Sequence, residues 1–194
     1  MIIGISGSAT PASSTDILIN EVLKGAKQNR FKSRFYRLNE MQILPCQACG
    51  KSPEPDYCFF HDDAFILYDK IAQSKAVVLG SPVYFDSVSA QTKIFIDRCN
   101  CFRPADFSSP EKQSFKEPLF KGKKGGIVLV AGDYGKFDAA LRVMRAFFIW
   151  AGMEIKFELK YQTKNMNYGE AKLDKKMLEK AFNCGLGLVD LSLL

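Results

Sequence analysis

Hydroxyl and small residues gather near the start of the chain, between an apolar run over residues 1–5 and an amphipathic stretch that begins at about Asp16. A loop that leads from a buried strand into a helix presents free backbone N–H groups and the positive end of the helix dipole to an anion. Such a loop suits one phosphate group. The hydroxyls placed to complete the cradle are those of Ser6, Ser8, Ser13, Ser14 and Thr15. The alternative is an ordinary strand-to-helix turn with a Ser or Thr cap.

The glycines of this loop follow neither common nucleotide-binding pattern. Gly4 and Gly7 do not form G-x-G-x-x-G, and the Gly-Lys-Ser/Thr of a P-loop is missing. A cradle of hydroxyls therefore indicates a single terminal phosphate.

A second group of reactive side chains lies in a long loop over residues 39–61, with Cys46, Cys49, Cys58 and His61. These are zinc-ligand types, but their spacing matches no familiar zinc module. The Cys46-x-x-Cys49 pair lacks the context of a thioredoxin-like redox motif. We therefore expect no metal here and interpret the thiols as free or buried. His61 fits a capping or surface position better than proton transfer. The other three cysteines are expected to pack in the interior: Cys99, Cys101 and Cys184.

Hydropathy patterns predict the elements that position these residues. Strands are expected at residues 1–5, 32–38, 76–80, 126–131 and 153–159. Five helices are expected: residues 16–28, one that starts at Asp62-Asp63, one that ends at about Arg98, residues 137–150 and residues 173–191. On the helix that ends at about Arg98, Lys93 and Asp97 are spaced to form an ion pair. Residues 83–89 are predicted as a loop, and residues 99–122 as an excursion that covers a site or packs on a partner.

Five strands that alternate with five helices predict an α/β fold, a doubly wound five-stranded parallel sheet with helices on both faces. Ligands of such sheets bind beyond the carboxyl ends of the strands. The loops at residues 6–15, 81–89 and 131–135 each follow an apolar strand, so we expect them to converge on one pocket.

Composition limits the classes of protein that fit. The 194 residues, 47% hydrophobic and 25% charged, suit one domain over residues 1–194. The net charge of +6 is spread along the chain, which does not favour nucleic-acid binding. Neither a membrane span nor a leader pattern is evident, so we expect a cytoplasmic protein with reduced thiols.

Several motifs occur in order along the first half of the chain. They are Gly7-Ser8, Ser14-Thr15, Pro45-Cys46-x-x-Cys49, Gly80-Ser81-Pro82-Val83-Tyr84-Phe85, Lys93 and Asp97-Arg98. In these the chain resembles the flavodoxin-like NAD(P)H-dependent FMN reductase superfamily, closest to its iron–sulfur flavoprotein branch. The resemblance implies a flavodoxin-like fold, bound FMN and NAD(P)H as co-substrate.

The resemblance also implies which residues hold FMN. Ser8, Ser14 and Thr15 match phosphate-loop positions, Pro82, Val83, Tyr84 and Phe85 match the segment that borders the ring, and Gly132 and Asp133 match the loop on the other side. Tyr84 or Phe85 stacks on the ring or packs elsewhere. Thr10 stands where many relatives carry Arg, which leaves the choice between NADH and NADPH open.

In the iron–sulfur branch, four closely spaced cysteines bind a [4Fe–4S] cluster. Here Ser52 stands where the third is expected, leaving Cys46, Cys49 and Cys58. We do not expect an intact cluster, and His61 or Cys99 would be a poor substitute ligand.

The resemblance implies an oxidoreductase that passes electrons from NAD(P)H through FMN to a quinone, nitro compound, flavin or protein acceptor. The flavin carries the chemistry, so no catalytic protein residue is expected. An electron carrier that does not itself oxidise NAD(P)H is the alternative, and a non-catalytic relative is a further one. A homodimer or homotetramer is expected, without a membrane or nucleic-acid partner.

Overall fold

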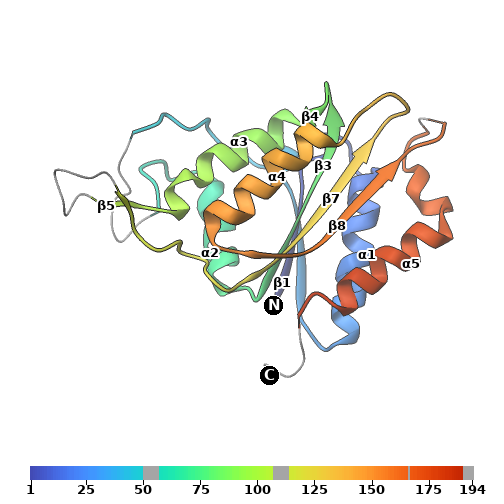
Figure 1. Cartoon of the computed structure of the whole chain (residues 1–194), viewed down its shortest axis with the longest axis horizontal. Coiled ribbons are helices and arrows are strands. Elements are labelled where there is room, and N and C mark those ends of the chain that lie inside the picture. The colour runs from blue at the N-terminus through green and yellow to red at the C-terminus, as the bar shows by residue number, and fades with distance from the viewer. Residues whose placement is uncertain (50–56, 107–113, 166, 190–194) are drawn as a thin grey trace.

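Five parallel strands form the central sheet, in the order β2-β1-β3-β7-β8 (Figure 1). They are β1 (Ile2–Ser6), β2 (Ser33–Arg37), β3 (Ala76–Tyr84), β7 (Lys124–Ala131) and β8 (Glu154–Gln162). This computed structural model describes residues 1–49, 57–106, 114–165 and 167–189. Ser6, Gly80 and Val128 are in register across the three inner strands, so their carboxyl ends share one edge of the sheet. The predicted doubly wound fold is confirmed.

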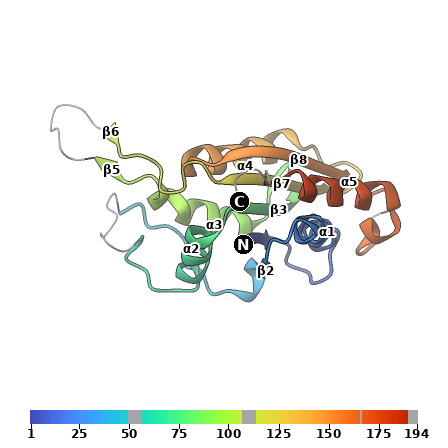
Figure 2. The ribbon, with the colours of Figure 1, turned by 90° about the horizontal axis from the view of Figure 1, so that it is seen from below.

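Helices cover both faces of the sheet (Figure 2). On one face lie α1 (Ser14–Gln28) and α5 (Lys175–Leu186), and on the other α2 (Ala64–Gln73), α3 (Ala90–Arg98) and α4 (Asp138–Ala151). No helix of the described residues is long and apolar enough to cross a membrane.

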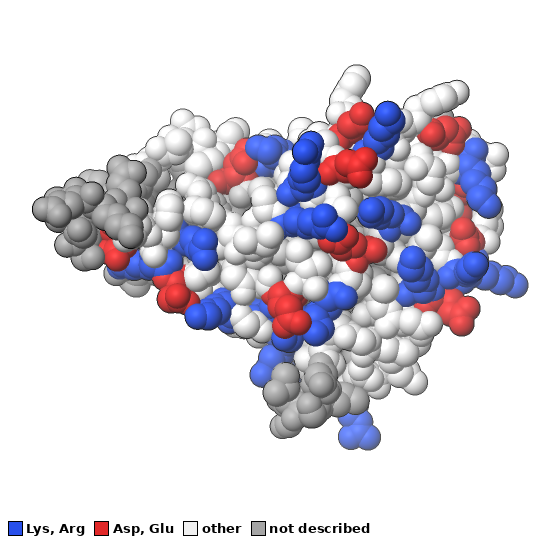
Figure 3. Space-filling view, viewed as in Figure 1, with Lys and Arg blue, Asp and Glu red and all other residues white. Residues whose placement is uncertain are grey.

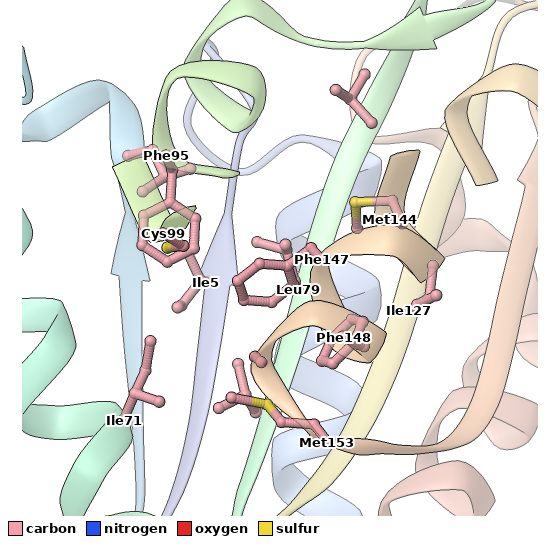
Figure 4. Close-up of a cluster of buried hydrophobic side chains, with 14 of the residues drawn as sticks. Ile5, Ile71, Leu79, Phe95, Cys99, Ile127, Met144, Phe147, Phe148 and Met153 are labelled. Atoms are coloured by element: carbon pink, nitrogen blue, oxygen red, sulfur yellow. The ribbon is translucent and has the colours of Figure 1, made fainter. Parts of the chain in front are cut away.

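Alternate residues of each strand supply the two apolar layers, because successive strand side chains point to opposite faces. Ile5, Leu79 and Ile127 pack against Phe95, Phe147 and Phe148 in the layer under α3 and α4 (Figure 4). Val78 and Val128 pack with Leu18 and Ile19 of α1 in the other layer. Both layers are fully buried at these positions, which fixes the strand ends that carry the candidate site.

The predicted loop at residues 83–89 is wrong at residues 83–84 and 87–88, which form the two strands of a hairpin. Strand β3 continues through Tyr84 and turns into β4 (Ser87–Val88) across a two-residue hairpin, with Tyr84 paired to Ser87. Phe85 and Asp86 take positive φ values of 49° and 57°. Such turns favour Asn-Gly or Asp-Gly, and Phe-Asp carries neither signal.

Smaller elements refine three other predictions. The excursion at residues 99–122 contains η2 (Cys99–Phe102) and a hairpin of β5 (Ala105–Asp106) and β6 (Ser114–Phe115), which projects beyond α3 and α4 (Figures 1 and 2). The closing helix was predicted too long: η3 (Glu170–Leu173) comes first, and Asp174 caps α5 by accepting from the Met177 amide at 3.0 Å. The short helix η1 (Leu38–Glu40) follows β2. Residues 190–191 of the predicted helix lie outside the described residues.

Two glycines bring α1 and α5 into backbone contact. A Cβ atom at Gly25 would overlap the carbonyl oxygen of Phe182, and one at Gly185 would overlap the carbonyl oxygen of Val22. Neither obstacle is the end of a flexible side chain, so only a shift of a whole helix would make room.

We predict that Gly25→Ala lowers the free energy of unfolding by about 1–3 kcal/mol, the usual cost of overpacking. Denaturant unfolding measures this change. The matched control is Gly187→Ala, whose added Cβ meets its nearest heavy atom at an ordinary 3.7 Å. Equal stability of the two variants would contradict the close contact between α1 and α5.

Candidate functional site

The loop between β1 and α1 offers backbone donors to an anion. Ser13 caps α1, because its hydroxyl accepts from the Asp16 amide at 3.2 Å. No hydrogen bond among the described residues uses the backbone N–H groups of Ala9, Ala12, Ser14 or Thr15. Unpaired amides at the positive end of a helix are a ready anion site.

The hydroxyls of the loop mostly hold its own shape. Ser6 donates to Asp16 Oδ1 at 2.5 Å, and Ser8 exchanges hydrogen bonds with the Thr10 backbone at 3.1 and 3.3 Å. Ser14 accepts from the Ala171 amide at 3.1 Å, which joins the loop to η3. Thr15 is buried beside Gly80. In this arrangement the amides, rather than the hydroxyls, are the available donors.

Behind the loop lies a buried ion pair that the sequence analysis missed. Asp16, in the first turn of α1, is 3% exposed, and its Oδ2 lies 3.2 Å from Arg37 Nε. Arg37 also donates to Glu40 at 2.6 Å and to the Ser8 carbonyl oxygen at 3.4 Å. A signal was available, because Arg37 lies next to the last residue of the second strand, predicted at residues 32–38, and so had to reach the same edge as the loop. In the sheet it is the register partner of Ser6.

A buried hydroxyl network joins the loop to the next segment. Ser89 caps α3 and donates to the Gly7 carbonyl oxygen at 2.6 Å. Its own amide donates to Ser81 Oγ at 2.9 Å, and Thr92 Oγ1 lies 2.9 Å from its hydroxyl. A side chain at Gly7 would overlap Thr92, so this close approach requires glycine.

The remaining predicted site residues meet at the same edge. Pro82 and Val83 are buried in the end of β3, whereas Tyr84 is half exposed and Phe85 wholly exposed on the hairpin. Asp86 accepts from the Lys136 amide at 2.9 Å, which ties the hairpin to the loop after β7.

In the loop after β7, Gly132 is partly buried and Asp133 exposed. The Gln162 side chain of β8 donates to the Gly132 carbonyl oxygen, and Tyr134 is almost wholly exposed. The edge therefore combines a loop whose backbone amides are available as donors with exposed rings, a combination suited to a phosphorylated molecule that carries a flat ring system.

The loop over residues 39–61, which carries Cys46, Cys49 and Cys58 and is called the cysteine loop below, is fastened to α3 by an ion pair between Arg98 and Asp62. The Arg98 side chain is 1% exposed and contacts Asp62 Oδ2 at 2.6 Å and Oδ1 at 3.1 Å. It also donates to the Leu44 carbonyl oxygen at 2.8 Å. Burial alone would raise the pKa of Asp62, but hydrogen bonds from Arg98, Leu44 and Ala64 outweigh it and hold that pKa below its ordinary value of 3.8. The predicted Lys93–Asp97 pair also forms, at 2.8 Å.

Four thiols line one cavity of about 130 Å³ beside Arg98: those of Cys46, Cys49, Cys58 and Cys101. The expectation that Cys101 packs in the interior is therefore wrong in part, because it is half-buried against this cavity, whereas Cys99 is fully buried. His61 is exposed and stacks on Phe65, with ring centroids 4.8 Å apart, and does not line the cavity. Cys184, on α5, is half-buried. Ser52 lies outside the described residues.

A family model described as NADPH-dependent FMN reductase matches residues 1–159. Two relatives are iron–sulfur flavoproteins. One, from Archaeoglobus fulgidus, is 33% identical over 154 residues, covering 79% of this chain and 73% of that protein. The other, from Methanocaldococcus jannaschii, is 32% identical over 149 residues, covering 76% and 71%.

Solved structures show the same fold. A flavone reductase superposes with a TM-score of 0.70 at 17% identity, covering 96% of this chain and 61% of that one. The chain thus spans less than two thirds of the flavone reductase. A flavodoxin from the domain Archaea superposes with a TM-score of 0.57 at 12% identity, covering 97% and 96%.

We predict that Asp62→Asn lowers the free energy of unfolding at about pH 7 by about 2 kcal/mol, the order of a hydrogen bond to a charged group. Because folding lowers the pKa of Asp62, its stabilisation is complete above 3.8 and is lost as the pH falls through the folded-state value. Denaturant unfolding at several pH values should therefore show the difference from wild type shrinking in acid.

The control is Asp69→Asn, on an exposed position of α2, which should stay within about 0.5 kcal/mol of wild type. If the free energy of unfolding of Asp62→Asn lies below that of wild type by the same amount at every pH, the carboxylate charge is not what stabilises the loop.

Proposed function

Because the chain belongs to the NADPH-dependent FMN reductase family, we propose that it is an oxidoreductase that uses FMN to carry electrons from NADH or NADPH to a second substrate. The observation that carries the proposal is the set of unpartnered amides at Ala9, Ala12, Ser14 and Thr15, on the edge where the exposed rings of the hairpin lie. The phosphate of FMN is the anion that these donors fit.

The residues present fit FMN in three segments. The loop at residues 6–15 would hold the phosphate through backbone N–H groups, with Ser6, Ser8 and Ser13 keeping its shape. The end of β3, from Pro82 to Phe85, would border the ring, and Gly132 and Asp133 would flank its other side. Bound FMN supplies the hydride-accepting ring. Backbone N–H groups beside the ring favour negative charge there.

Arg37 makes this site compatible with a phosphate. A buried carboxylate such as that of Asp16 repels an anion bound at the same helix terminus, and the guanidinium at 3.2 Å compensates its charge. Arg37 thus supplies cationic charge near a loop in which Thr10 offers none. We assign Arg37 a positioning role rather than a catalytic one.

The acceptor is proposed as a class: a quinone, nitro compound, free flavin or electron-transfer protein. The wholly exposed Phe85 and Tyr134 leave the edge open to a large acceptor or to a second copy in a homodimer or homotetramer. The names of the iron–sulfur flavoprotein relatives are compatible with the alternative, an electron carrier that does not itself oxidise NAD(P)H.

Surface charge supports the proposal that nucleic acid is not a partner. On the face shown in Figure 3, Lys and Arg side chains are interspersed with Asp and Glu, so no strong single-sign field forms there. We also propose a cytoplasmic location, whose reducing conditions keep thiols such as Cys46 and Cys58 reduced.

We predict that the purified protein loaded with FMN absorbs near about 450 nm and is bleached by NADH or NADPH under anaerobic conditions, since hydride transfer is the chemistry that FMN brings. Titration with each nucleotide in turn, followed by absorbance, measures the preference. Bleaching by dithionite alone would favour the carrier, and failure to bind FMN would contradict both.

We predict that Arg37→Gln weakens FMN binding about tenfold, or about 1.4 kcal/mol, because the charge of Asp16 is then uncompensated. Fluorescence quenching of added FMN, measured at a temperature where the variant is folded, gives the dissociation constant. The matched control is Arg34→Gln, an exposed position of the same strand, which should bind like wild type.

A double variant shows whether Arg37 acts by neutralising the charge of Asp16 or by contacting FMN directly. If Arg37 acts by neutralising Asp16, then Asp16→Asn in the Arg37→Gln background should restore most of the affinity. If affinity stays low in a folded double variant, the compensation mechanism is wrong.

A further inference from the structure

The thiols that line the cavity beside Arg98 are not placed as metal ligands. Among the residues that the structure describes, no three Cys, His, Asp or Glu side chains could hold one ion together. An iron–sulfur cluster, which the names of two relatives suggest, therefore has no fitting ligand set in this part of the chain. No step of the proposed reaction passes through such a cluster.

The tip of the β3–β4 hairpin holds two residues in a strained backbone conformation. Phe85 and Asp86 have positive φ values of 49° and 57°, a region that glycine adopts far more readily than other residues. Phe85 is wholly exposed, so packing of its side chain does not offset this cost. Glycine in place of Asp86 would relieve the strain there, but it would also remove the carboxylate.

The carboxylate of Asp86 makes a contact that glycine could not make. Its Oδ1 accepts a hydrogen bond from the Lys136 backbone amide at 2.9 Å. Lys136 lies just before α4, and Phe137, which precedes the helix, has no side chain that can cap it. Negative charge is favourable at this end of a helix, because it faces the positive end of the dipole. Asp86 supplies such charge from another segment, in addition to Asp138 of the first turn.

This hydrogen bond joins the hairpin to the loop after β7, and both segments extend beyond the sheet at the top of Figure 1. The loop is held from its other side by Gln162 of β8, which donates to the carbonyl oxygens of Gly132 and Gly135. Among the described residues, no other hydrogen bond or ion pair joins the tip of the hairpin to this loop. The contact between Asp86 and Lys136 therefore limits how far the two segments can separate.

Exposed rings stand on both of the joined segments, with Phe85 on the hairpin and Tyr134 on the loop. In the proposed oxidoreductase these segments would border the FMN ring on either side. A site whose walls are already held together has less freedom to lose when the ligand binds, and this favours affinity.

We propose that Asp86 is a positioning residue for the flavin ring. Its carboxylate joins the hairpin to the loop after β7 and so fixes the spacing of the two segments that would enclose the ring. The inference rests on the proposed function, because the ring is taken to be that of FMN. The hydrogen bond itself can be measured without FMN.

Two variants test the role of the carboxylate. Asp86→Gly accepts the left-handed turn and removes the acceptor, whereas Asp86→Asn tolerates the same turn and keeps an acceptor oxygen. In the absence of FMN, the Lys136 amide of Asp86→Gly should exchange its hydrogen about fivefold faster than that of wild type. Asp86→Asn should exchange like wild type. Exchange is followed residue by residue by NMR, and denaturant unfolding shows that each variant is folded.

The same variants are then titrated with FMN. Asp86→Gly should bind FMN about fivefold more weakly than wild type and should alter the visible circular dichroism of bound FMN at saturation, which reports the surroundings of the ring. Asp86→Asn should restore both properties. The matched control is Arg30→Gly, which relieves a positive φ of 64° at an exposed residue after α1 and should bind FMN like wild type.

Equal exchange at Lys136 in wild type and in Asp86→Gly overturns the proposal, because the hydrogen bond then does not hold the loop. Faster exchange with unchanged FMN affinity and circular dichroism also overturns it, as does failure of Asp86→Asn to restore them. A wild-type protein that binds no FMN contradicts the proposed oxidoreductase and the positioning role together. That failure is distinguishable, because it appears before any variant is compared.

Discussion

The side chain of Ser89 is the contact on which the candidate site most depends. Ser89 is 1% exposed, and its hydroxyl caps α3 and donates to the carbonyl oxygen of Gly7, while its backbone amide donates to Ser81 Oγ. Ser89 therefore joins the β1–α1 loop, the end of β3 and the start of α3 through its hydroxyl and its amide. Parallel strands bring these segments to one edge, but only specific polar contacts set their distances. The absence of a side chain at Gly7 is what lets α3 approach so closely.

A buried carboxylate, that of Asp16, and a half-buried one, that of Asp62, are compensated in the same way. Asp16 faces Arg37 behind the β1–α1 loop, and Asp62 faces Arg98 behind the cysteine loop. In each case a guanidinium from a neighbouring element compensates a charge that burial alone would disfavour, and also donates to a backbone oxygen of the loop. The loops are thus fastened to the sheet and to α3 by charge, and the cysteine loop also by apolar contacts of Ile43 and Tyr57 with the core.

The sequence predicts the sheet well because its inner strands are near-uniform apolar runs, as at residues 76–80 and 126–131. It predicts the shared edge of the site because topology follows from the alternation of elements. It misses the hairpin after Tyr84, since Phe85 and Asp86 lack the residues typical of such a turn. It misses the ion pair of Arg37 with Asp16 and the position of Cys101 at the cavity beside Arg98. Both bring together segments that are distant in sequence, and such contacts leave no local pattern. For Cys101 no spacing rule within the long loop would have pointed to η2.

The backbone contacts of Gly25 with Phe182 and of Gly185 with Val22, and the hydrogen bond from the Ala171 amide to Ser14, support the β1–α1 loop through segments that follow the last strand of the sheet. Helix α1 leaves the ribosome early, yet the helix that covers it is translated after every strand of the sheet. Before η3 and α5 are made, the Ser14 hydroxyl lacks the Ala171 amide as its donor, and the backbone of α1 at Val22 and Gly25 is uncovered. The complete support of this loop therefore forms only after all five strands of the sheet have been translated.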